Sequence, residues 1–243
     1  MTACTFLYFL LFDPPWSFAV IGDTQSNWHI ARKAVIAIKA AHPDFTVHLG
    51  DVWGCGSLNR WRATRRMFKG LRTHWVIGNH ELRVCGQRAH QPKRYRTMWL
   101  RSFQRNRTTE TWDHKGYSFI TIDSATPDVY PSQLRWFREM LAKTSKPLFL
   151  FGHRPFPRRR PERWYRLLDP MPWRWRNAKL GGLIEENDYR IMAKFHGHWH
   201  GYRHYGKTWC SGGGGGLLAR GQRYHWLLVT VVGPFVTVER KLI

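Results

Sequence analysis

The stretch FTVHLGD, residues 45–51, decides the fold, because a short apolar run ends in a glycine and then a carboxylate. An apolar run of this length bounded by glycine is typical of a buried β-strand. The same order, with a polar residue after the glycine, recurs in four further stretches: WSFAVIGD (16–23), THWVIGN (73–79), PLFLFGH (147–153) and RIMAKFHGH (190–198). The sequence therefore predicts five strands that each end in a glycine followed by a polar side chain.

Helices are predicted between several of these strands. Apolar residues repeat at helical spacing over residues 28–41 and 58–71, and Pro131 and Ser132 begin a segment that runs to Lys143. A strand is also expected at 117–123, a helix at 178–187 and a strand pair at 226–243. Residues 83–109 are expected to form a helix plus loops at best. The alternation of strands and helices favours βαβ units around a largely parallel sheet.

The polar residues after the glycines are candidate metal ligands. In open α/β sheets, ligands bind at the carboxyl ends of the strands, so these side chains are expected to meet at one place. They offer carboxylate, amide and imidazole donors: Asp23, Asp51, Asn79, His153, His198 and His200. This set exceeds the needs of one first-row metal ion and suits two ions that share a bridging carboxylate.

Five motifs carry a family resemblance. IGDTQ, HLGDVWG, IGNHE, FGHRP and FHGHWHG follow one another from about residue 18 to 201 and resemble the calcineurin-like metallophosphoesterase superfamily. The resemblance implies an α/β protein with a four-layer α/β/β/α sandwich, the metallo-dependent phosphatase fold, as a single domain over residues 1–243. It also implies a dinuclear metal centre at the strand ends and hydrolysis of a phosphomonoester or phosphodiester by a metal-bridging hydroxide.

The resemblance also assigns a role to each site residue. Asp23 and His200 would bind the first metal ion, and Asp51 would bridge both ions. Asn79, His153 and His198 would bind the second ion, and His80 would be the catalytic histidine. The two divalent ions would be Mn, Fe, Zn or Mg. In FHGHWHG, strand alternation would place three histidines on one face, but the resemblance assigns no role to His196, which is expected to be structural.

Two departures from the family pattern affect the expected chemistry. Gln25 stands where the first motif usually ends in His, and its amide is a weaker donor than imidazole for a transition metal. The protein serine/threonine phosphatases of the family carry GDxxDRG, whereas Gly54 and Cys55 occupy the last Asp and Arg positions here. The second departure counts against a phosphoprotein phosphatase of that type.

Charge bears on the substrate. Lys and Arg total 39 against 16 Asp and Glu, a formal net charge of +23. Such a field attracts polyanions, although an arginine-rich composition would give the same total. The basic residues are dense at 60–72, at 83–107 and in a Pro/Arg/Trp-rich insertion at about 154–176. The expected partner is an anionic phosphate ester, with nucleic acid as a candidate.

Three functions therefore stay open. The first is an enzyme acting on a small phosphate ester, and the second is a nuclease that holds nucleic acid on its basic surface. The third is a non-catalytic metal- or nucleic-acid-binding protein.

The remaining sequence features concern the compartment. The apolar stretch at residues 5–12 is too short for a membrane helix and lacks a preceding Lys or Arg, so it is interpreted as a strand or buried arm. A cytoplasmic protein without a membrane span is expected, with four reduced thiols. The alternative is a disulfide between Cys55 and Cys85, because each follows a motif loop.

Overall fold

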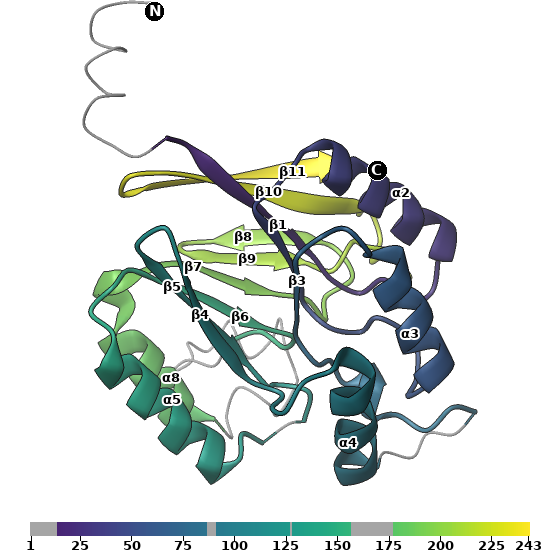
Figure 1. Ribbon diagram of the computed structural model, residues 1–243, viewed down its shortest axis with the longest axis horizontal. Helices are drawn as coiled ribbons and strands as arrows, with labels where there is room; N and C mark the ends of the chain where they lie inside the picture. Colours follow the sequence, from purple (N-terminus) through teal and green to yellow (C-terminus); the bar gives the residue numbers. More distant parts are fainter. Residues whose placement is uncertain (1–13, 87–90, 127, 157–176) are drawn as a thin grey trace, which may run out of the picture.

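The computed structural model describes residues 14–86, 91–126, 128–156 and 177–243. The apolar stretch at residues 5–12 and most of the predicted insertion, residues 157–176, lie outside these ranges. Within them, two β-sheets pack face to face, and helices cover both outer faces (Figure 1). The predicted four-layer α/β/β/α sandwich is confirmed.

The first sheet has the strand order β11-β10-β1-β2-β3. Its strands are β1 (Trp16–Ile21), β2 (Phe45–His48), β3 (Thr73–Trp75), β10 (His225–Val232) and β11 (Phe235–Leu242). β1, β2 and β3 are parallel neighbours, and the predicted terminal strand pair β10–β11 adds antiparallel strands at the other side of β1.

The second sheet has the strand order β4-β5-β6-β7-β9-β8. Its strands are β4 (Glu110–His114), β5 (Tyr117–Ile122), β6 (Leu148–Gly152), β7 (Ile191–His196), β8 (Tyr202–Tyr205) and β9 (Thr208–Ser211). The parallel run β5-β6-β7 matches the prediction from sequence. The edge strand β4 was not predicted because its sequence, ETWDH, is mostly polar and contains no apolar run.

Helices form the outer layers. One outer face is covered by α2 (Trp28–Ala40), α3 (Leu58–Met67) and α4 (Pro92–Phe103), and the other by α5 (Pro131–Lys143) and α8 (Ala178–Glu186). Single 3-10 turns occur at His80–Leu82 and Asp188–Arg190. The predicted helix at 58–71 ends early, at Met67, before Gly70 takes a φ of 92°. No helix in the described ranges has the length and apolar character needed to cross a bilayer.

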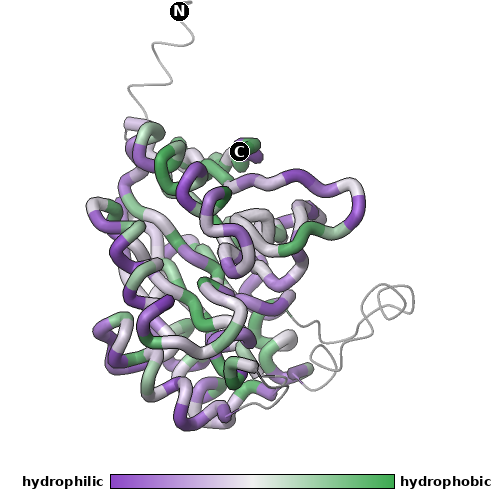
Figure 2. The backbone as a smooth tube through the Cα atoms, turned by 90° about the vertical axis from the view of Figure 1, so that its right-hand side faces the viewer, coloured by the Kyte–Doolittle hydropathy of each residue, from purple (hydrophilic) through white to green (hydrophobic). Residues whose placement is uncertain are grey.

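The core between the sheets is aromatic. Phe18 and Phe45 from the first sheet stack with ring centroids 5.0 Å apart, and Phe119 and Phe149 from the second sheet stack at the same distance. All four rings are buried, and edge contacts join the two pairs across the sheets. Figure 2 shows the apolar stretches concentrated inside the fold, with polar segments around its outline. This packing fixes the two sheets relative to each other, and therefore the loops at their edges.

Candidate metal centre

The predicted site residues come from both sheets and meet at one edge of the sandwich. Asp23 follows β1, Asp51 follows β2, and Asn79 lies in the loop after β3. His153 follows β6, and His198 follows β7. Because β1, β2 and β3 are parallel, as are β6 and β7, these residues lie at the carboxyl ends of their strands, as expected.

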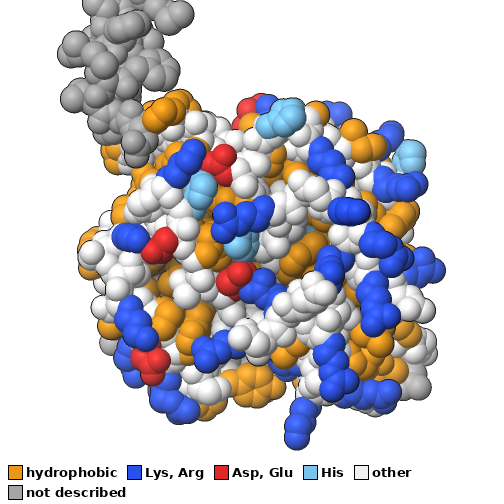
Figure 3. Space-filling model, in the orientation of Figure 1, with side chains coloured by type: hydrophobic (Ala, Val, Ile, Leu, Met, Phe, Trp, Pro, Cys, Tyr) orange, Lys and Arg blue, Asp and Glu red, His pale blue; other side chains and the backbone are white. Residues whose placement is uncertain are grey.

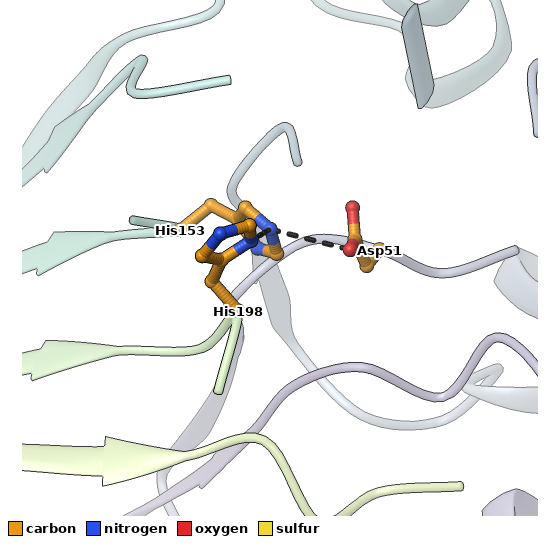
Figure 4. Close-up of side chains that lie close together, drawn as sticks. All are labelled: Asp51, His153 and His198. Atoms are coloured by element: carbon orange, nitrogen blue, oxygen red, sulfur yellow. Dashed lines mark hydrogen bonds and ion pairs between the residues drawn. The ribbon is translucent and has the colours of Figure 1, made fainter. Parts of the chain in front are cut away.

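Two groups of side chains could each hold a metal ion, and Asp51 belongs to both. The first group is Asp23, Asp51 and His200, and the second group is Asp51, His153 and His198. Within each group the candidate ligand atoms lie within 4.8 Å of one another. Figure 4 shows His153 and His198 turned toward Asp51, with His153 Nε2 3.2 Å from Asp51 Oδ2. A carboxylate shared by two such groups is suited to bridging two ions.

The backbone at these positions adopts conformations that aim the side chains into the site. Asp23, Asp51 and His198 have φ values of 57°, 54° and 67°, in the left-handed region that non-glycine residues rarely adopt. A Cβ on Gly78 would lie 2.2 Å from Asp51 Oδ1, and one on Gly197 would lie 2.4 Å from Asp23 Oδ2. The two glycines therefore let the carboxylates approach the neighbouring loops closely.

Two histidines are held by main-chain carbonyls in the orientation that ligation requires. His153 Nδ1 donates to Leu49 O at 2.9 Å, and His200 Nδ1 donates to Leu217 O at 2.7 Å. With Nδ1 committed to a carbonyl, the Nε2 of each ring faces the carboxylates, and on loss of any Nε2 proton its lone pair is free to bind a metal ion. These carbonyl partners were not visible in the sequence, because any residue carries a carbonyl and only the chain path places it.

Gln25 lies at the first group, as the motif position predicts. Its Nε2 is 3.0 Å from His200 Nε2, and its buried Oε1 has no hydrogen-bond partner. A buried carbonyl oxygen without a partner is costly, and a metal ion would satisfy it. The donor set and this orphaned oxygen therefore fit a bound divalent cation.

Asn79, His80 and Glu81 occupy the turn after β3, and each makes a different contact with the metal-binding loops. Asn79 Oδ1 is 2.9 Å from His153 Nε2, so the amide belongs to the second group. The backbone N–H of His80 donates to Asp51 Oδ1 at 2.9 Å. The buried Glu81 carboxylate accepts from the backbone N–H groups of Asp51, Val52 and Gly78, at 2.9, 2.9 and 2.6 Å. Glu81 thus joins the loops after β2 and β3.

The His80 ring is anchored on one nitrogen and open on the other. Its Nδ1 donates to Gly54 O at 2.8 Å, and its Nε2 lies 4.0 Å from Asp51 Oδ2. The side chain is 25% exposed, so Nε2 can reach a group that enters from solvent. Gly54 is the residue that replaces the Asp of the GDxxDRG pattern, and here its main-chain carbonyl holds the ring.

A disulfide links the same two loops. Cys55, after β2, is bonded to Cys85, after the turn that carries His80. β2 and β3 are adjacent parallel strands, so the loops that follow them lie side by side. The expectation of four reduced thiols is therefore wrong for these two cysteines, and the alternative is confirmed. Cys210 is free and buried, and Cys4 lies outside the described residues.

Burial and neighbouring charges shift the pKa values of the site residues in different directions. Burial raises the pKa of Asp23, and the hydrogen bond with His200 only partly opposes this. Burial would also raise the pKa of Asp51, but the adjoining His153 more than offsets it and leaves the pKa lowered. Burial lowers the pKa of His153, yet the two nearby carboxylates win and raise it to about 9. Burial and the neighbouring His153 lower the pKa of His198 to about 2.

The alternation in FHGHWHG does not extend through the motif. β7 ends at His196, and the chain then turns, so His198 and His200 do not lie on a strand face with His196. The expectation of one face is therefore wrong. His196 is buried. Its Nδ1 lies 2.9 Å from Gly197 O, and its Nε2 lies 3.3 Å from the Tyr205 hydroxyl. It belongs to neither metal-competent group.

Arg154, directly after His153, was not singled out in the sequence. Its side chain is largely buried, and Nη1 lies 3.1 Å from His198 Nε2. The guanidinium therefore brings a fixed positive charge beside the second group. Its position after a site histidine was the available signal, but the surrounding arginines hid it.

Solved structures share this fold. Protein TT1561 of Thermus thermophilus is 13% identical and has a TM-score of 0.60, over 93% of this chain and 99% of that one. GAP50, described as the anchor in the inner membrane complex of Plasmodium, is 13% identical with a TM-score of 0.56, over 95% and 85%. A putative 5'-nucleotidase from Staphylococcus aureus is 12% identical with a TM-score of 0.52, over 94% and 53%.

The comparison with families is more specific than these structural similarities, which at such low identity show the fold alone. No curated protein matches the chain. The model of the calcineurin-like phosphoesterase family matches residues 17–202, which include every predicted site residue. The chain therefore belongs to the calcineurin-like phosphoesterase family.

Proposed function

We propose that this chain is a metal-dependent phosphoesterase that hydrolyses a phosphomonoester or phosphodiester with two divalent ions. The observation that carries this proposal is the position of Asp51, which belongs to both metal-competent groups. Asp23, Gln25 and His200 would hold the first ion with Asp51. Asn79, His153 and His198 would hold the second. Bound ions would supply Lewis-acid activation of water and neutralise charge on the phosphoryl oxygens.

Protein groups around the ions would do the rest of the chemistry. The Gly54 carbonyl keeps the proton of neutral His80 on Nδ1, so Nε2 faces the site. A second proton taken up at Nε2 could then be given to the leaving oxygen of the ester. The Arg154 guanidinium, beside His198, would attract the phosphoryl group and hold it in place.

The proposal is tested by hydrolysis of an aryl phosphomonoester and an aryl phosphodiester with Mn²⁺ supplied. Asp51→Asn should abolish turnover, because both groups lose their common carboxylate. His80→Ala should keep its metal content and lose about 10²- to 10⁴-fold in turnover, the usual contribution of an acid–base group. Turnover that survives Asp51→Asn, or full activity in His80→Ala, would contradict the assignment.

The alternative to an enzyme is a non-catalytic role, because GAP50, which shares the fold, is described as an anchor. It would be favoured if metal-loaded protein hydrolyses neither the aryl esters nor an oligonucleotide. A cytoplasmic location stays a prediction. The Cys55–Cys85 disulfide weighs against it, because such bonds persist mainly in oxidising compartments.

A further inference from the structure

The helices α3 and α4 form a surface of one charge. They pack against each other, and Arg65 on α3 donates to Ser102 O and Gln104 Oε1 at the end of α4, at 2.7 and 3.0 Å. Together they carry eight basic residues and no acidic residue: Arg60, Arg62, Arg65, Arg66, Lys93, Arg94, Arg96 and Arg101. Figure 3 shows Lys and Arg gathered along the right-hand side of the molecule, where Figure 1 places these helices.

The opposite helical layer provides an internal comparison. α5 and α8 have 13 and 9 residues, the same total as the 10 and 12 residues of α3 and α4. They carry four basic residues against three acidic ones: Arg135, Arg138, Lys143 and Lys179 against Glu139, Glu185 and Glu186. An arginine-rich composition would affect both layers alike. The excess on α3 and α4 is therefore a property of that face.

Few acidic groups neutralise this face from nearby. Between residues 58 and 107 the sequence contains 14 Lys and Arg and one acidic residue, Glu81, which is buried against the metal-site loops. Arg96 pairs with Asp123 at 2.8 Å, and Arg105 pairs with Glu110 at 2.6 Å. The exposed cations Arg62, Arg66 and Arg94 have no ion pair among those found in the described residues.

Two hollows interrupt the basic surface, and one of them is apolar. One of about 800 Å³ is lined by Leu58, Pro92 and Met98, with Lys93, Arg94 and Arg101 around it. Another of about 980 Å³ lies at the far end of α3; it is polar, lined by Arg65, Arg66 and Lys69 together with Glu110, above the buried Phe68 and Phe103. Cations around an apolar hollow suit a ligand that carries both phosphates and accessible bases, which a duplex hides.

The surface starts at the candidate metal centre. α3 begins a few residues after Asp51, and α4 follows the loop that carries His80. At this end Arg60 lies over the ring of Trp53, 4.4 Å from its centroid, and Trp28 contacts Trp53 edge-on. Both indoles are half-buried, so part of each ring is accessible. With helix lengths of about 15 and 18 Å, the face spans a few nucleotides.

We propose that the α3–α4 face binds single-stranded nucleic acid and leads the strand to the metal centre. Its cations would contact backbone phosphates, and its apolar hollow and the Trp28–Trp53 pair would contact bases. As a statement about substrate this rests on the proposed phosphoesterase function, since cleavage adds water across one P–O bond of the diester. Binding itself does not depend on catalysis.

Binding is measured with the full chain carrying Asp51→Asn, to prevent cleavage, and a labelled single strand of about 12 nucleotides. If about six phosphates are contacted, log K falls with log salt with a slope near −4, and affinity drops about 300-fold between 50 and 200 mM salt. Adding Arg62→Gln, Arg66→Gln and Arg94→Gln should reduce the slope by about 2 and weaken binding by about 100-fold at 0.1 M salt.

The matched control carries Arg135→Gln, Arg138→Gln and Lys143→Gln on α5, the same change in net charge at exposed positions. It should bind within about threefold of the parent, because distant charges are screened. Equal losses in both triple variants would mean a general charge effect and would overturn the proposal. So would tighter binding of a duplex, or binding of anionic lipid vesicles but not of the oligonucleotide.

The two proposals fail in different ways. Hydrolysis of aryl esters without oligonucleotide binding would refute the surface and keep the phosphoesterase. Oligonucleotide binding with the expected variant pattern, but no hydrolysis of any ester by metal-loaded wild type, would keep the surface and refute the phosphoesterase.

Discussion

Replacing both Cys55 and Cys85 with serine is expected to lower the free energy of unfolding by about 3.6 kcal/mol. The bond joins residues 30 positions apart, and closing a loop of that length removes about 12 cal/mol/K of entropy from the unfolded chain. For a chain of this size, that loss corresponds to a fall in Tm of about 7–14 °C. The folded loops should stay paired, because Gly56 N still donates to Arg83 O at 2.8 Å.

The assay is urea unfolding of metal-free protein followed by tryptophan fluorescence, with and without a reductant. Reductant should shift wild type to the value of the double variant, leave the variant unchanged and release two additional thiols. In the metal-loaded enzyme, kcat should fall while KM and metal content hold, because the Gly54 carbonyl that orients His80 adjoins Cys55. A variant within about 0.5 kcal/mol of wild type, insensitive to reductant, would refute the reasoning.

Two further predictions concern the metal-binding groups. In metal-free protein the His153 ring stays protonated on both nitrogens up to about pH 9. Metal binding must therefore release the Nε2 proton. Apparent Mn²⁺ affinity should therefore rise between pH 6.5 and 9 and level off above pH 9. Calorimetry measures this affinity, and repeating it in buffers of different ionisation enthalpy counts the protons released. An affinity that does not change with pH would contradict the raised pKa of His153. Without metal, the interaction of protonated His153 with Asp51 stabilises the fold fully below pH 6.5, and this contribution is lost as the pH approaches 9. Gln25→His should tighten Zn²⁺ binding at one of two sites by about tenfold, since imidazole is the stronger donor; equal tightening at both sites would argue against its placement beside His200.

Much of the site was predictable because strand periodicity and chain order carry the information. Each apolar run ending in glycine formed a strand, and parallel strands bring their carboxyl ends to one edge. Asp23, Asp51 and His153 could therefore be grouped from sequence alone. The structure brings the predicted set into one hydrogen-bonded cluster, whereas the roles of its members as ligands stay predictions.

The parts that were not predicted depend on the path of the chain through space. Main-chain carbonyls of Leu49 and Leu217 orient two histidines, and no residue type signals such a partner. The edge strand β4 has a polar sequence, so periodicity could not reveal it. Local alternation misled at His198, where a φ of 67° turns the chain out of β7. Glu81 carries a carboxylate of the kind that binds metal ions, but this carboxylate accepts hydrogen bonds from three backbone N–H groups instead.

The measurement that tests the central claim most directly is the number of Mn²⁺ ions bound per chain after equilibrium dialysis, in wild type, Asp23→Ala and Asp51→Ala. Because Asp51 belongs to both groups and Asp23 to one, we expect two ions in wild type, one in Asp23→Ala and weakened binding at both sites in Asp51→Ala. A single ion in wild type, or two ions held equally well by Asp51→Ala, would contradict a dinuclear centre built around Asp51.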